Sequence, residues 1–155
     1  MTRPIVPPAP CSQNEHRQFD FWIGEWEVRD ASGKLQGHNT IEPILGGCVL
    51  KESWRGTSGN VGESFNLYDK QAGHWHQSWV DNDGTLLKLD GGLHDNAMVM
   101  QGPGKAQDGS GLMNRITWTP LEDGRVKQHW QTSHDGGETW SDAFVGFYAR
   151  HEAAK

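Results

Sequence analysis

The sequence predicts an all-β protein: a single antiparallel up-and-down β-barrel of about ten strands, with a short N-terminal helix plugging one end. Turn-forming residues recur about every ten residues, and each cluster closes a short run of alternating apolar and polar side chains. No helical crossover pattern separates these runs, which argues against a parallel sheet. A sheet of about ten twisted strands left open would expose two edges, so closure into a barrel is expected.

The N-terminal region is expected to be a tail followed by a helix. Four prolines in the tail fix the backbone and remove hydrogen-bond donors, which favours an extended segment. Ser12 and Glu15 have the spacing of a capping box at a helix start. Phe19 and Trp22 would then share one helical face and plug the barrel. The tail and the barrel domain are predicted over 1–13 and 14–151.

Ten runs are predicted to be strands, and the loops between them carry Gly, Asn and Asp residues that suit hairpin turns. No sequence repeat of fixed period accompanies them. The predicted strands cover 25–30, 35–45, 49–57, 62–69, 74–81, 85–93, 97–102, 112–119, 125–132 and 139–150.

Two hairpins indicate which side chains face the lumen. If Gly84 is the left-handed residue of a three-residue loop, Trp79 pairs with Leu87. If Thr119 pairs with Arg125 across a later loop, the inward side chains of the strands at 112–119 and 125–132 can be assigned in the same way. The predicted inward residues are Trp75, Gln77, Trp79, Leu87 and Leu89, with Asn114, Ile116, Trp118, Val126, Gln128 and Trp130.

The composition predicts a core built from a few large rings. Only 34% of the residues are hydrophobic, yet eight of the 155 are tryptophan. Each indole N–H requires a hydrogen-bond partner when it is buried, so polar side chains are expected among the rings. A lumen lined by both kinds of side chain suits a small-molecule pocket.

Charge and hydropathy exclude some partners. The formal charge is −6, from 14 basic and 20 acidic side chains, and no basic run occurs, so neither nucleic acid nor an anionic membrane is an expected partner. No run of eighteen apolar residues and no signal-peptide h-region is found, which predicts a cytoplasmic location. A homodimer is left open.

The two cysteines, Cys11 in the tail and Cys48 near a strand, do not form a disulfide framework. We predict free thiols, with a single bridge as the alternative.

Glu52 is the only candidate for a catalytic residue. It alternates with Leu50 and Trp54, so it shares their face of the strand. If that face is inward, desolvation should raise the pKa of Glu52 and suit it to acid or base chemistry. The alternative, which we favour, is a structural carboxylate paired with Arg55 or Arg115.

Histidines offer candidate metal and haem ligands. His74 and His76 lie on the same face of one strand, a spacing that can chelate a metal ion if a third ligand approaches. The hairpin register places them outside, which favours a solvated pair. A haem site would need an inward axial histidine, for which the candidates are His94, His129 and His151.

The segment from Ser133 to Trp140 matches the Asp-box pattern of sialidase-like propellers. Its predicted role is structural: Asp135 accepts turn hydrogen bonds, Gly137 permits positive φ and Trp140 anchors the strand. A propeller needs several such boxes, and this chain has one.

The run from Phe19 to Val28, Phe-Asp-Phe-Trp-Ile-Gly-Glu-Trp-Glu-Val, resembles the opening of DUF1579, a family of bacterial domains of unknown function. The segments around Tyr68-Asp69, Trp75 to Gly84 and Arg115 to Pro120 extend the resemblance over nearly the whole chain after the tail. The resemblance implies a lipocalin-like barrel of the calycin kind. Calycin relatives bind small hydrophobic ligands, and fold analogy of this kind is a weak warrant for function.

The sequence therefore predicts a barrel that binds a small apolar or aromatic molecule in a Trp-lined cavity. The alternatives are a small isomerase, hydratase or cyclase that uses Glu52, a barrel that binds haem or a metal, and a module filled by its own side chains. No nucleophile, phosphate-binding or dinucleotide motif occurs, so no cofactor is predicted. The predicted ligand-binding residues are Trp54, Asn66, Trp75, Gln77, Trp79, Trp118, Gln128 and Trp130.

Overall fold

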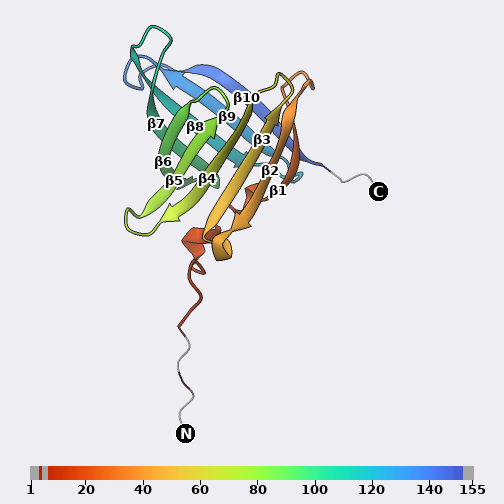
Figure 1. The fold of residues 1–155 in the computed structure, drawn as a ribbon, viewed down its shortest axis with the longest axis vertical. Coiled ribbons are helices and arrows are strands. Elements are labelled where there is room, and N and C mark those ends of the chain that lie inside the picture. The colour runs from red at the N-terminus through yellow and green to blue at the C-terminus, as the bar shows by residue number, and fades with distance from the viewer. Residues whose placement is uncertain (1–3, 5–6, 152–155) are drawn as a thin grey trace.

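The computed structural model describes residue 4 and residues 7–151. Ten antiparallel strands form a closed barrel in which each strand pairs with its neighbours in sequence and β1 pairs with β10 (Figure 1). The predicted fold class is confirmed. The strands are β1 Gly24–Arg29, β2 Leu35–Ile44, β3 Val49–Gly56, β4 Val61–Asp69, β5 His74–Asp81, β6 Leu86–His94, β7 Ala97–Lys105, β8 Gly111–Pro120, β9 Val126–Ser133 and β10 Ser141–Arg150.

Of the two predicted hairpin registers, one is confirmed and one is shifted. Trp79 pairs with Leu87, and Gly84 has φ of 79°. Thr119 pairs with Lys127 and not with Arg125, so the register is shifted by two residues from the predicted one. A slip of two residues preserves the alternation of faces, so the predicted inward set of β8 and β9 is still inward.

The N-terminal plug consists of two short 3-10 helices, η1 Asn14–Arg17 and η2 Asp20–Trp22, at the lower end of the barrel in Figure 1. The predicted capping box is wrong: the Ser12 hydroxyl donates to Ala9 O at 2.7 Å, and Gln13 occupies the N-cap position. Phe19 and Trp22 stack 4.7 Å apart and are fully buried, as a plug requires. None of the described helices is long and apolar enough to cross a membrane.

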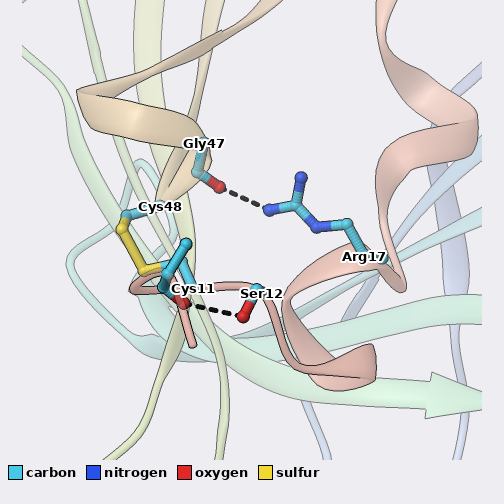
Figure 2. The surroundings of a disulfide bond; sticks show 6 residues. Cys11, Ser12, Arg17, Gly47 and Cys48 are labelled. Carbon is cyan, nitrogen blue, oxygen red and sulfur yellow. Dashed lines mark hydrogen bonds between the residues drawn. A yellow bond between two sulfur atoms is a disulfide. The ribbon is translucent and has the colours of Figure 1, made fainter. Parts of the chain in front are cut away.

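The two cysteines form a disulfide, so the prediction of free thiols is wrong. Cys11 and Cys48 are joined across 37 residues, and the adjacent Arg17 guanidinium donates to the carbonyl of Gly47 (Figure 2). Part of the predicted tail, residues 1–3 and 5–6, lies outside the described chain. The bridge attaches the segment before η1 to the short helix η3 Leu45–Gly47 and the start of β3. Disulfides persist in oxidising compartments, so the bridge does not support the predicted cytoplasmic location.

Candidate functional site

The eight predicted ligand-binding residues all face the lumen, but they fall into three zones. Trp75 and Trp118 lie at the end plugged by η2 and are about 2% and 1% exposed. Asn66 and Gln77 are buried at mid-height, where Gln128 is half-buried. The remaining three lie at the opposite end, which we call the open end, and are half-buried: Trp54, Trp79 and Trp130.

At the plugged end the rings pack against each other. Phe19 contacts Trp75 edge-on, with ring centroids 5.6 Å apart, and Trp118 at 5.1 Å. The Trp75 indole nitrogen donates to Glu15 O and to the Gln18 side chain, both in the N-terminal segment. These two predicted ligand-binding tryptophans therefore belong to the packed core of this end.

A network of polar side chains crosses the middle of the lumen and converges on Glu52. On one side, Gln77 donates to Asn66 at 2.7 Å, Asn66 donates to Ser64 at 2.8 Å, and Ser64 donates to Glu52 Oε1 at 2.6 Å. On the other side, Asn39 donates to Glu52 Oε2 at 2.7 Å. Both carboxylate oxygens thus accept a hydrogen bond from the protein.

Burial raises the pKa of Glu52. The residue is 5% exposed, and desolvation raises the pKa of its carboxyl, partly offset by the hydrogen bonds from Ser64 and Asn39. The predicted ion pair is wrong: Arg55 is exposed on the outer face, and Arg115 bonds Gln131 and stacks on the ring of Trp140. Among the described residues, no salt bridge involves Glu52.

Asn39 and Tyr148 complete the network, and sequence reasoning missed both. Asn39 uses its second N–H to donate to the Tyr148 hydroxyl at 2.9 Å, and Tyr148 donates to Gln128 Oε1. Desolvation and the nearby Glu52 raise the pKa of Tyr148 well above 10, which keeps the phenol protonated. Their strand parity was available as a signal, since Asn39 alternates with Gly37 and lies opposite Trp54.

Gln128 is the most exposed member of this network. The other six members are Asn39, Glu52, Ser64, Asn66, Gln77 and Tyr148, and each is at most 5% exposed. Gln128 is half-buried although it faces inward beside Trp130. Gln128 is therefore the member of the network nearest to solvent.

At the open end, two indole rings lean against glycines of neighbouring strands. A Cβ placed on Gly37 would come within 2.7 Å of the Trp54 ring, and one on Gly62 within 2.2 Å of the Trp79 ring. Trp54 also meets Phe144 edge-on, with ring centroids 6.5 Å apart. The open end is lined by half-buried apolar side chains: Trp54, Trp79, Leu87, Trp130 and Phe144.

Two surface clefts lie elsewhere. The larger, of about 500 Å³, is at the plugged end between η1 and strands β5 and β6, where Gly92 leaves space and Tyr68 and His94 also line the cleft. The smaller, of about 300 Å³, lies beside Arg125 and the β1–β2 turn. Of the predicted ligand-binding residues, only Trp75 lines the larger cleft, and none lines the smaller.

Several buried polar atoms have no hydrogen-bond partner among the described residues. Three are in the lumen: Asn39 Oδ1, Trp22 Nε1 and Trp118 Nε1. An unpaired buried polar atom costs about 1–3 kcal/mol.

The predicted histidine candidates lie on the outside of the barrel. His76 Nδ1 is 2.7 Å from Asp90 Oδ1, and His74 Nδ1 is 3.7 Å from the same oxygen, so the two histidines share an acid partner. The haem candidates do not enter the lumen either: His94 and His151 are exposed, and His129 is 2.6 Å from the exposed Asp142. None of the three is the inward axial ligand that a haem site requires.

The Asp-box is a turn, as predicted. Thr139 donates two hydrogen bonds to Asp135 and Ser133 a third, which together lower the pKa of Asp135 to about 2. Gly137 has φ of 95°, and the Trp140 indole donates to its carbonyl at 3.1 Å. The motif supports the hairpin between β9 and β10.

No family model matches the chain, and no curated protein matches it in sequence. The resemblance to DUF1579 therefore stays a prediction.

Proposed function

We propose that the protein binds a small, largely apolar molecule that enters at the open end of the barrel. One observation supports the proposal: a hydrogen-bonded network is buried in the lumen except at the half-buried Gln128, which lies beside Trp130, one of the half-buried aromatic side chains of the open end. Ligand sites are typically apolar with a few placed polar groups, and the mouths of barrels are common places for them.

The walls and the polar end of this site suggest the kind of ligand. Trp54, Trp79 and Trp130 offer large, rigid surfaces for an aliphatic or aromatic body. Gln128 and the unpaired Asn39 Oδ1 lie deeper, where a hydroxyl, amide or acid group on the ligand could bond. A fatty acid, a retinoid or an aromatic acid has this arrangement of an apolar body and a single polar end.

The test is a titration of the protein with that ligand panel, followed by calorimetry on any ligand that quenches tryptophan fluorescence saturably. Gln128→Leu should weaken binding of a polar-headed ligand about 2- to 10-fold, the value of one net hydrogen bond. Gly92→Leu is the matched control, because it fills the cleft at the plugged end, where a Cβ would meet no atom within 4 Å.

Two outcomes would contradict the proposal. A flat response to the whole panel would favour a barrel filled by its own side chains. Binding that survives Gln128→Leu but is lost in Gly92→Leu would place the ligand in the cleft at the plugged end.

A proton-transfer enzyme that uses Glu52 is the second candidate, favoured by the raised pKa of that carboxyl. Against it, both oxygens of Glu52 accept hydrogen bonds from Ser64 and Asn39, and the residue is only 5% exposed. If a substrate is found, Glu52→Gln should abolish its turnover on this reading. If turnover is unchanged, the role of the Glu52 carboxylate is structural.

A further inference from the structure

A second cluster of chemically active side chains lies on the outer face of the barrel, away from the lumen. Glu27 on β1 is directly opposite His38 on β2, and His151 follows the last residue of β10. One potential ligand atom from each lies within 4.8 Å of the other two. It is the one such trio among the residues that the structure describes.

The geometry points to a zinc site formed by Glu27, His38 and His151, a proposal independent of the lumen. Glu27 Oε1 is 3.2 Å from His151 Nδ1 and 3.8 Å from His38 Nε2. Tetrahedral zinc with bonds of about 2.0–2.1 Å separates its ligand atoms by about 3.3 Å. Small side-chain adjustments would bring all three onto one ion.

The donor set and its accessibility suit zinc with an open coordination position. Two imidazoles and one carboxylate match three-ligand zinc sites, in which water takes the fourth position. The side chains of Glu27, His38 and His151 are 32%, 47% and 42% exposed. An ion can therefore reach them without opening the barrel.

Neighbouring groups hold these ligands in place. Arg29 lies 3.4 Å from Glu27 Oε2, the oxygen that faces away from the histidines, which orients Oε1 toward them. The backbone N–H of His151 donates to Glu25 O at 2.8 Å, which fixes the end of β10 against β1. The rings of His38 and His151 meet edge-on, 5.2 Å apart.

The position of the cluster also suggests what the ion would do. β1 and β10, the first and last strands, close the barrel through four paired positions, from Trp26 with Arg150 to Arg29 with Phe147. A metal held by β1, β2 and the residue after β10 would bridge this closing seam. Zinc should therefore raise the melting temperature of the folded protein.

The experiment is zinc titration of the untagged full chain by competition with a chromogenic chelator, with melting temperature as the second readout. We expect one zinc ion per chain and a rise of a few degrees. His38→Ala and His151→Ala should each weaken zinc binding at least about tenfold and remove the rise. Glu27→Gln, which preserves the shape of the side chain, should act in the same direction.

His76→Ala is the matched control, since His76 also lies beside an exposed carboxylate but outside the trio. It should leave zinc affinity unchanged. Absence of bound zinc at tens of micromolar would overturn the site. So would parental affinity in His38→Ala, His151→Ala and Glu27→Gln, or loss of binding in His76→Ala. Equal melting temperatures of the metal-free variants show that lost binding is not lost folding.

Discussion

The burial of Glu52 makes the stability of the barrel depend on pH. Its pKa is higher in the folded chain than the ordinary value of 4.5, so the folded state holds this proton more tightly than the unfolded state does. The contribution of Glu52 is fully present below pH 4.5 and is lost as the pH rises through the folded pKa.

Replacing Glu52 by Gln should flatten this dependence, because the amide does not ionise. We expect the difference in free energy of unfolding, variant minus parent, to be more positive at pH 8 than at pH 4.5, as measured by urea denaturation. Glu63→Gln is the control, since Glu63 is an exposed carboxylate on the next strand. Parallel curves for Glu52→Gln and the parent would contradict the inferred pKa direction.

Gly62 should be intolerant of any side chain. Its Cβ would lie 2.2 Å from the Trp79 ring, so Gly62→Ala must displace that indole. We expect a loss of about 1–3 kcal/mol in the free energy of unfolding, the usual cost of overpacking. Gly92→Ala meets no atom within 4 Å and should cost much less. Equal effects of the two substitutions would contradict this account of the open end.

At the scale of secondary structure, turn chemistry made the strands predictable. Every loop between consecutive strands contains Gly, Asn or Asp, and β5 begins and ends where the sequence predicts, at His74 and Asp81. The N-terminal segment was less predictable. Ser12 and Glu15 match a capping box, but Ser12 bonds Ala9 instead, next to a cysteine that the disulfide holds. A tertiary link thus overrode a local preference.

The disulfide should contribute substantially to the stability of this N-terminal plug. It closes a loop spanning 37 residues, for which chain entropy predicts up to about 4 kcal/mol. We expect the double variant Cys11→Ser, Cys48→Ser to lose stability in urea denaturation under oxidising conditions. The parent under dithiothreitol should match it. If dithiothreitol leaves the stability of the parent unchanged, the disulfide adds nothing to that stability.

At the scale of the whole molecule, closure depends on the pairing of the two strands most distant in sequence. Val28 on β1 lies opposite Tyr148 on β10 and is fully buried. Such a contact requires nearly the whole chain to be in place, which favours slow folding and late formation of the seam.

Val28→Ala should therefore mainly change the rate of unfolding. Removing about two methylene equivalents costs about 1.6 kcal/mol. If the seam forms after the transition state, unfolding accelerates about tenfold while refolding changes little. Stopped-flow tryptophan fluorescence in urea measures both rates. Slower refolding with an unchanged unfolding rate would show that the seam forms early.

The candidate site was predictable only in part. Period-two alternation placed Gln77 and Gln128 inside, as the structure has them, because strand parity is a local property of the chain. It put Glu52 on the face of Leu50 and Trp54 but did not decide whether that face is inward. The partners of Glu52 were wrong, because the choice between an arginine and an asparagine depends on which strands become neighbours and in which register.

The sequence by itself determined the all-β class, a barrel of about ten strands and the inward face of two hairpins, because turns and alternation act over a few residues. Only the tertiary structure decided the disulfide, the network from Gln77 to Gln128 and the grouping of Glu27, His38 and His151. Each joins residues far apart in the chain, and contacts of that kind exist only after the barrel has closed.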